Sequence, residues 1–300
     1  MPFTPSPDAS VCAVVVTRDR RELLRECLTA IAAQSRPAQH VVVVDNASSD
    51  GTAAMVREEF PAVELLALES NGGGAGGFHA GMGHAHAASH DWLWLMDDDT
   101  IPTASALEAL LEPLRDLNGL APPMILASRV EWTDGRLHPK NFPLPRLDEH
   151  DNRSFLDAVG RGLLAIRLAS FVSILVHREA IDRYGLPHRH YFIWGDDGEY
   201  TARVLKEQVG YTVPGSVVRH KTSGLESVHE DTTGNYYFEV RNKLLQMRSG
   251  SFTSREKIHL AIATAMGIRR YLAHNQLRPR ALAVLVRALR DGLRQPADSA

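Results

Sequence analysis

Three consecutive carboxylates, Asp97, Asp98 and Asp99, follow an apolar run that begins at Trp92. A short apolar run with aromatic residues and no helical periodicity is typical of a buried strand, so the carboxylates are expected where that strand leaves its sheet. Adjacent carboxylates repel one another unless a cation neutralises them, and alternate residues of an extended chain can face the same ion. The sequence therefore predicts a divalent metal site at Asp97 and Asp99. The alternative is an acidic start to the helix expected at residues 104–117.

A second acidic pair, Asp196 and Asp197, comes between the aromatic-rich segment 191–194 and a helix expected at residues 200–208. A carboxylate held by aromatic side chains at a helix start can orient a substrate hydroxyl and accept its proton, which is what a general base must do. The alternative is N-capping of the helix, which we expect for one of the two carboxylates.

A histidine, His220, ends another strand expected at residues 211–219. A lone histidine is usually structural, but the predicted metal lacks a third protein ligand, and a neutral imidazole would supply it.

Strands and helices alternate in the N-terminal half, and their order decides where these side chains lie. Strands are expected at 11–17, 40–44 and 63–68, with helices at 23–31 and 52–59 between them. This alternation predicts an α/β fold with a mainly parallel, right-handed, doubly wound central sheet flanked by helices.

Polar residues follow three of these strands: Thr17-Arg18-Asp19, Asp45-Asn46 and the acidic triplet. The carboxyl ends of parallel strands meet at one edge of the sheet, where open α/β sheets bind ligands. The simplest occupant is a nucleotide, with Asp45 accepting hydrogen bonds from base or ribose and the metal binding the diphosphate. Asp45 alone could equally be a turn former.

A glycine-rich segment, residues 71–83, holds five glycines between Asn71 and Phe78. It matches neither the dinucleotide-binding nor the P-loop pattern. The glycines would allow the backbone to approach a ligand closely, and the helix after them would offer its N-terminus to phosphate; the alternative is a flexible loop. Four histidines follow, and without interleaved acidic partners they predict a surface helix rather than a second metal site. These are His79, His84, His86 and His90.

The middle of the chain, residues 117–167, is rich in proline and charge. We expect a strand at 124–132, then a long, mobile excursion over the sheet edge near an acceptor site, and a strand at 168–177.

Charge is distributed unevenly. Residues 241–300 contain 12 of the 33 Lys and Arg but only 3 of the 36 Asp and Glu, so the body is acidic and the tail basic. An acidic body argues against nucleic-acid binding, while a basic tail suits an anionic surface. Only Cys12 and Cys27 are present, both expected in the core, which indicates a reducing compartment.

The C-terminal tail has the pattern of a basic amphipathic helix, with arginines on one side and apolar residues on the other. Membrane contact and packing on the body with a solvated arginine face remain alternatives. The arginines are Arg280, Arg287, Arg290 and Arg294, and the apolar residues are Leu282, Leu285, Val286, Leu289 and Leu293. No apolar run approaches the ~20 residues of a spanning helix, and the N-terminus lacks a signal-peptide pattern.

The order of these features over residues 11–245 resembles the inverting nucleotide-sugar glycosyltransferases of family 2, which have the GT-A fold. The strand ending in Thr17, the segment 45–52 and the acidic triplet carry this resemblance. Within the family, the glycine motif 71–78, the run 94–99 and the segment 192–197 are similar to galactofuranosyltransferases of mycobacterial-type cell walls. The segment 235–242 also resembles one shared with rhamnosyltransferases.

The resemblance implies a role for each candidate residue. Asp97, Asp99 and His220 would bind Mn²⁺ or Mg²⁺, and Asp197 would be the catalytic base. The donor and acceptor would be bound by Thr17, Arg18, Asp45, Asn71, Gly76, Gly77, Asp98, Trp194 and Asp196. Residues 1–245 would form the GT-A domain, and residues 246–300 a basic helical appendage.

The expected function is metal-dependent transfer of galactofuranose from UDP-galactofuranose, with inversion, to a glycan acceptor carried on a polyprenyl diphosphate. The short chain favours a single addition over processive polymerisation. The alternatives are a rhamnosyltransferase using dTDP-rhamnose, a sugar nucleotidyltransferase, and a non-catalytic binding protein. We expect a cytoplasmic protein, at the inner face of the plasma membrane if the tail contacts lipid.

Overall fold

The computed structural model describes residues 6, 8–117, 119–141, 143–146, 152–222 and 234–297, with the backbone alone for 152–155. Within these ranges one mixed sheet has the order β3-β2-β1-β4-β9-β6-β10-β8-β7, and β5 pairs with β10. The strands are β1 (Val11–Thr17), β2 (His40–Asp45), β3 (Glu64–Ala67), β4 (Trp92–Asp97), β5 (Thr100–Pro102), β6 (Pro123–Glu131), β7 (Leu144–Pro145), β8 (Leu164–Leu168), β9 (Ile174–His177) and β10 (Val209–His220).

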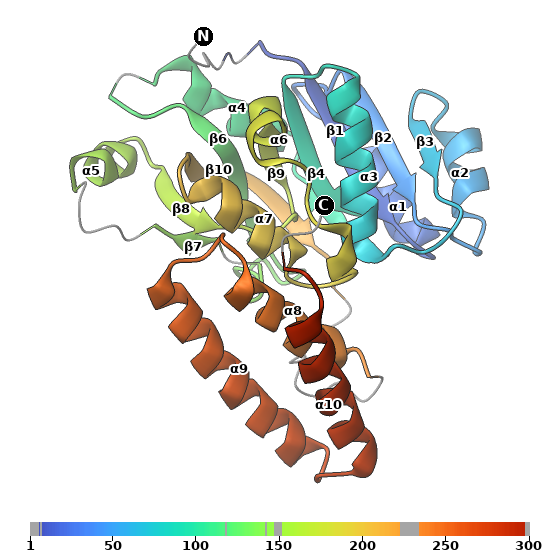
Figure 1. Cartoon of the computed structure of the whole chain (residues 1–300). Helices are drawn as coiled ribbons and strands as arrows, with labels where there is room; N and C mark the ends of the chain where they lie inside the picture. The colour runs from blue at the N-terminus through green and yellow to red at the C-terminus, as the bar shows by residue number, and fades with distance from the viewer. Residues whose placement is uncertain are drawn as a thin grey trace.

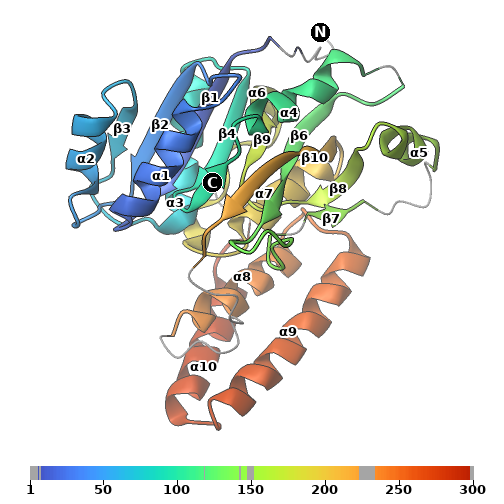
Figure 2. The ribbon, with the colours of Figure 1, turned by 180° about the vertical axis from the view of Figure 1, so that it is seen from behind.

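Helices cover both faces of the sheet (Figures 1 and 2). The helices are α1 (Arg21–Ala32), α2 (Thr52–Glu59), α3 (Gly73–Ala87), α4 (Ala106–Leu111), α5 (Asn152–Gly160), α6 (Arg178–Tyr184), α7 (Asp196–Leu205), α8 (Tyr236–Arg248), α9 (Ser254–His274) and α10 (Pro279–Arg294), with short 3₁₀ turns η1 (Glu112–Arg115) and η2 (Arg189–Tyr191).

The period-two pattern of β1 explains how both faces are buried. Val11, Ala13 and Val15 pack in one core cluster with residues of α1, α2 and α4. Cys12 and Val14 pack in the other with residues of α3, α6 and α7. Burial on both faces is the reason these strands are almost continuously apolar, and it confirms the doubly wound α/β prediction.

The sheet is parallel from β3 to β4 and mixed beyond it. β1 pairs in parallel with β2 and β4, so Thr17 lies beside Asp45, and Val16 beside Asp97. This register brings the three predicted polar loops to one edge. Beyond β4 the next strand, β9, is antiparallel to both of its neighbours.

The strand expected at 168–177 is two strands, so that prediction is wrong. β8 ends at Leu168 and pairs with β10, whereas β9 begins at Ile174 and pairs with β4 and β6. The chain turns between them at Ser173, which has a φ of 61°. Only part of the excursion expected before them is described; it contains β7 and α5, and its residues 118, 142 and 147–151 lie outside the described ranges.

The glycine-rich segment is helical from Gly73, so the alternative of a flexible loop is wrong and the expected helix, α3, begins within the glycines. A Cβ atom at Gly77 would lie 2.4 Å from Val16 Cγ1, and one at Gly81 would lie 2.5 Å from Val14 Cγ1. Glycine is therefore needed on this face because α3 packs almost directly against β1. Close helix–sheet packing outweighs the low helix propensity of glycine here.

The three C-terminal helices form a bundle that extends away from the sheet (Figure 1). Their shared core contains Tyr236, Tyr271 and Leu285, one from each helix. The boundary expected at residue 245 falls inside α8. None of the helices in the described ranges has both the length and the apolarity needed to cross a bilayer.

Candidate active site at the carboxyl ends of the strands

The candidate metal ligands come from three chain segments that the sheet aligns. Asp97 is the last residue of β4, and Asp99 precedes β5, which pairs with β10 so that Thr100 faces His220. One ligand atom from each of Asp97, Asp99 and His220 lies within 4.8 Å of the others. The alternative of an acidic helix start is wrong, because β5 separates the triplet from α4.

The surroundings of these carboxylates shift the pKa of Asp97 and that of Asp99 in opposite directions. Burial, then the charges of Asp99 and Asp98 and of the pair Asp196–Asp197, raise the pKa of Asp97 well above its ordinary value. Burial would also raise the pKa of Asp99, but hydrogen bonds from His220 (2.9 Å) and from Arg20 (2.7 Å) hold it below the ordinary value.

These residues fit a divalent cation. Two carboxylates and an imidazole are suitable ligands for Mn²⁺ or Mg²⁺, and a cation there would relieve the repulsion on Asp97. His220 is held for this role: its Nδ1 lies 2.8 Å from Asn141 Oδ1. Nε2 donates to Asp99 Oδ1 here, so a cation bound between them would replace that proton, and donation from Nδ1 to Asn141 would then keep the imidazole in the coordinating tautomer.

Arg20 is a site residue that the sequence interpretation missed. Its Nη1 atom lies 3.2 Å from Asp98 Oδ1 and 2.7 Å from Asp99 Oδ2. It follows directly on the predicted loop Thr17-Arg18-Asp19, so its place after β1 was the available signal. Its side chain is half exposed, which leaves a positive charge at the edge where a diphosphate would bind.

Asp98 points back to the loop after β1 and is not one of the three candidate metal ligands. Its Oδ2 atom accepts hydrogen bonds from Thr17 Oγ1 (2.8 Å) and from the backbone N–H of Arg18 (3.4 Å). Burial raises its pKa to about 6 even though Arg20 opposes the shift. The structure thus brings Thr17, Arg18 and Asp98 together beside the metal ligands.

Asp45 and its neighbour Asn46 organise the loop after β2. Asp45 Oδ1 accepts from the Ser48 N–H (2.9 Å), which is the turn-forming role kept as an alternative. Asn46 reaches the start of α3: its Oδ1 accepts from Gly72 N (2.8 Å) and its Nδ2 donates to Gly73 O (2.6 Å). Asn46 was missed as a site residue, because its partners are backbone groups 26 and 27 residues away.

The start of α3 joins the nucleotide edge to the second acidic segment. Asn71 Oδ1 accepts from Gly73 N (2.9 Å), and Ala75 N donates to Phe192 O (3.1 Å). A Cβ atom at Gly73 would lie 2.0 Å from Phe192 O, so glycine is required there. Gly76 faces open space within 4 Å, whereas Gly77 packs on the sheet.

The predicted base, Asp197, lies in the first turn of α7. The N-cap residue is Gly195, with a φ of 86°, so the alternative that Asp196 or Asp197 caps this helix is wrong. Asp197 Oδ1 instead accepts from the Gly198 N–H at 2.6 Å. Both carboxylates contribute to the raised pKa of Asp97, so the two acidic clusters are close enough to interact electrostatically.

Burial also raises the pKa of both carboxylates of this pair. The pKa of Asp196 rises to about 8, first through burial and then through the charge of Asp197. Burial is likewise the main cause of the raised pKa of Asp197, and several backbone N–H groups oppose it. A carboxylate with a raised pKa is a better proton acceptor near neutral pH, as long as it is ionised there.

Residues of α8 hold the segment before α7 in a strained conformation. Phe192 and Trp194 both have positive φ angles, 65° and 63°. Asn242 Nδ2 donates to the backbone oxygens of Ile193 (2.7 Å) and Trp194 (2.7 Å). Trp194 itself is 38% exposed, in keeping with a surface that meets a substrate. Two further side chains of α8 bond to this segment's backbone, Arg241 and Gln246.

We expect Asn242→Ala to lower kcat by roughly 10- to 100-fold, because Ile193 and Trp194, which precede the predicted base Asp197, lose the hydrogen bonds that hold their backbone. The Michaelis constant for the nucleotide sugar should change much less. Steady-state kinetics would measure both. Asn275→Ala is the matched control, since Asn275 Nδ2 also donates to a backbone oxygen, that of Tyr271, but in α9. Equal losses in the two variants would contradict this positioning role.

Asp196 predicts a pH dependence of stability. Its raised folded-state pKa means that the folded protein keeps a proton that the unfolded chain releases near pH ~3.9. Stability without metal should therefore fall as the pH rises from about 4 to about 8. Asp196→Asn should flatten this fall and raise the unfolding temperature at pH 8 by roughly 4 °C. Thermal unfolding at a series of pH values measures it, and an unchanged pH curve would rule out Asp196 as the cause.

Comparisons with known proteins agree with this fold. The sequence model of glycosyl transferase family 2 matches residues 12–185. A galactofuranosyltransferase, GlfT1 of Mycolicibacterium smegmatis, is 32% identical over 197 residues, which cover 65% of each chain. The chain thus spans 65% of the length of this relative.

Two solved structures show the same fold at low sequence identity. The structure of S. aureus TarS 1–349 in complex with UDP has a TM-score of 0.61 and 15% identity, covering 95% of this chain and 80% of that one. The mannosyltransferase PcManGT of Pyrobaculum calidifontis, in complex with GDP-Man and Mn²⁺, has a TM-score of 0.53 and 18% identity, covering 99% and 84%. With its mixed α/β sheet and its family match over residues 12–185, this chain is a glycosyltransferase with the GT-A fold and belongs to glycosyl transferase family 2.

Proposed function

We propose that this glycosyltransferase transfers galactofuranose from UDP-galactofuranose to a glycan acceptor, with inversion and with a divalent cation. The observation that carries the proposal is the meeting of Asp97, Asp99 and His220, with the carboxylates of α7 close enough to raise the pKa of Asp97. The name of the M. smegmatis relative supports the choice of sugar.

In this mechanism each group acts at a defined point. Asp197 accepts the proton of the acceptor hydroxyl, whose oxygen attacks the anomeric carbon on the face opposite UDP, so the bond to UDP breaks and the configuration inverts. Arg20 stabilises the negative charge that the departing diphosphate gains. Mn²⁺ or Mg²⁺, held by Asp97, Asp99 and His220, supplies further neutralisation of that charge when bound.

The alternative of a rhamnosyltransferase rests on the segment 235–242. In the structure, the side chains of Arg241 and Asn242 donate hydrogen bonds to backbone oxygens within residues 190–194. These contacts position the base segment whatever the sugar, so the shared segment is weak support for dTDP-rhamnose. The nucleotidyltransferase and non-catalytic alternatives are not carried forward, because the chain is a glycosyltransferase.

The test is an assay with Mn²⁺, a rhamnose-containing acceptor on a polyprenyl diphosphate, and the donors UDP-galactofuranose, UDP-galactopyranose and dTDP-rhamnose. We expect transfer from UDP-galactofuranose and larger thermal stabilisation by UDP than by dTDP. Transfer from dTDP-rhamnose alone would overturn the sugar assignment.

We further propose that the C-terminal bundle contacts an anionic membrane carrying the lipid-linked acceptor, at the cytoplasmic face. In α10 the small residues Ala281, Ala288 and Gly292 are buried, while Val286 and Leu293 are 66% and 61% exposed. The helix thus packs through its small residues and leaves an apolar stripe outside, flanked by arginines, as a membrane-surface helix does.

Vesicle sedimentation tests this contact. We expect binding to vesicles of phosphatidylglycerol and phosphatidylcholine, weaker binding at high salt, and none to phosphatidylcholine alone. The double variant Val286→Asp, Leu293→Asp should lose binding, while the control Leu144→Asp, at an exposed leucine of β7, should retain it. Equal binding by both variants would exclude α10 as the contact.

A further inference from the structure

A second group of potential metal ligands lies at the opposite end of the strands from the catalytic edge. Cys12 lies in β1, His40 begins β2, and His90 lies between α3 and β4. Ligand atoms of the three residues lie within 4.8 Å of one another. Cys12 precedes Val16, the neighbour of Asp97, by four residues, so the two groups are roughly 13 Å apart along the strand.

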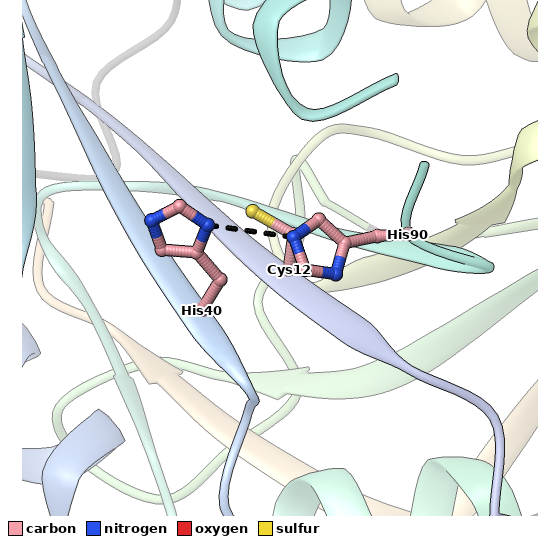
Figure 3. A group of neighbouring side chains, drawn as sticks. All are labelled: Cys12, His40 and His90. Carbon is pink, nitrogen blue, oxygen red and sulfur yellow. Dashed lines mark hydrogen bonds between the residues drawn. The ribbon is translucent and has the colours of Figure 1, made fainter. Parts of the chain in front are cut away.

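Sheet register brings the first two side chains together. Cys12 of β1 and His40 of β2 are direct partners in the parallel pairing, so their side chains lie on the same face. Figure 3 shows the Cys12 sulfur directed toward the rings of His40 and His90, with the backbone of His90 on the side away from His40. His90 Nε2 lies 3.4 Å from His40 Nδ1. Three ligand atoms of the kind that Zn²⁺ prefers thus converge from three segments.

The carboxylate of Glu64 orients the His40 ring through Nε2, the ring nitrogen that does not face Cys12. Glu64 of β3 lies with its Oε2 atom 2.9 Å from His40 Nε2, and its Oε1 atom 2.8 Å from His84 Nε2. Donation from Nε2 to Glu64 gives His40 the tautomer whose Nδ1 atom, facing Cys12 and His90, carries a lone pair. A carboxylate on the outer nitrogen is the usual support of a zinc-bound histidine.

We propose that Cys12, His40 and His90 bind Zn²⁺, with Glu64 as the partner that orients His40. A sulfur and two imidazole nitrogens select a borderline ion such as Zn²⁺ over Mn²⁺ or Mg²⁺, which prefer oxygen. Water would complete the tetrahedron, since both histidines are partly exposed. The ion would tie β1, β2 and the α3–β4 connection together.

The pKa shifts of two of these ligands act on metal binding in opposite directions. Burial, then the neighbouring His40, lower the pKa of His90, which keeps its imidazole neutral, the form that binds metal. Burial, then Glu64, raise the pKa of the Cys12 thiol to about 12, so zinc binding must release a proton and should strengthen as the pH rises.

The helix expected for the histidine-rich segment is α3, which holds His79, His84 and His86 in partly exposed positions, whereas the proposed site would add a role for His90. The sequence offered no acidic partner near the histidines, and a surface helix was expected instead. The acidic partner is Glu64, which reaches them from β3. The other ligands, Cys12 and His40, come from strands far earlier in the chain.

The test is titration of the whole chain with Co²⁺, a spectroscopic substitute for Zn²⁺, in excess Mg²⁺ to occupy the carboxylate site. A thiolate bound to Co²⁺ gives a charge-transfer band in the near ultraviolet, which a site of carboxylates and histidine lacks. We expect this band to saturate at one equivalent of Co²⁺ and to vanish when Zn²⁺ is added.

Three variants complete the test. Cys12→Ala should abolish the band, His90→Gln should weaken Co²⁺ binding at least 10-fold, and Cys27→Ala, at the other buried cysteine, should leave the band unchanged. His90 is partly exposed, so His90→Gln gives a result even if Cys12→Ala folds poorly. No band in the natural protein, a band that survives Cys12→Ala, or one lost in Cys27→Ala would overturn the proposal.

Discussion

Asp197→Asn should lower turnover by about 10³-fold while leaving the affinity for UDP nearly unchanged. The expected loss corresponds to removal of a general base that takes the proton of the acceptor hydroxyl. The substitution keeps the local structure, because an asparagine Oδ1 can still accept the hydrogen bond from the Gly198 N–H. Steady-state turnover and calorimetric titration with UDP and Mn²⁺ would separate the two effects.

The pH dependence of kcat tests whether the lost turnover comes from loss of a general base. The limb of the kcat profile that reports ionisation of the base should be present in the natural enzyme and absent in Asp197→Asn. Asp182→Asn, at an exposed carboxylate of α6, is the matched control and should keep natural turnover. Turnover within a few-fold of natural in Asp197→Asn would remove this residue from the mechanism.

Asp97→Asn should lower activity at least 100-fold and yet stabilise the protein in the absence of metal. The raised pKa of Asp97 shows that its ionised form is disfavoured by burial and by four neighbouring carboxylates. Above its ordinary pKa this residue therefore lowers the stability of the folded state, and a neutral amide removes the repulsion. We expect a gain of ~1–2 kcal/mol in unfolding free energy at pH 7.

With Mn²⁺ bound, the natural protein should become more stable than Asp97→Asn. The natural protein should gain a larger increase in unfolding temperature from Mn²⁺ than Asp97→Asn does, because the variant has lost a charged ligand. Glu112→Gln, at an exposed carboxylate of η1, should behave as the natural protein does. If Asp97→Asn destabilised the chain without metal, or kept its full response to Mn²⁺, Asp97 would not be a ligand.

Local sequence patterns predicted the N-terminal half of the fold well. The strands β1 to β4 are short apolar runs separated by helical periodicity, and both signals depend only on residues near one another. The split between β8 and β9 was missed because it depends on which neighbour each strand finds across the sheet. The start of α3 was missed because glycine has low helix propensity. Only the packing of this helix against Val14 and Val16 explains why glycines occur in it.

The candidate site was predictable where it follows strand ends and was not where it depends on long-range hydrogen bonds. The acidic triplet, Asp197 and His220 all lie next to recognisable elements. Asn46 and Asn242 were missed because their amides bind backbone groups of distant segments. No local pattern records such a pairing, since any residue can supply a backbone oxygen.

Helix α8 contacts both the segment before α7 and the C-terminal helix α10. Its inner side holds the backbone around Trp194, and its outer side packs on α10, where a Cβ atom at Gly292 would lie 3.0 Å from Arg241 O. Arg248 Nη1 also donates to the backbone oxygens of Gly292 and Gln295, both at 2.7 Å. Helix α8 thus connects α10 directly to the segment that precedes Asp197, the proposed base. Deleting α9 and α10 should therefore slow catalysis even on a water-soluble acceptor, because α8 would lose the contacts that hold its outer side.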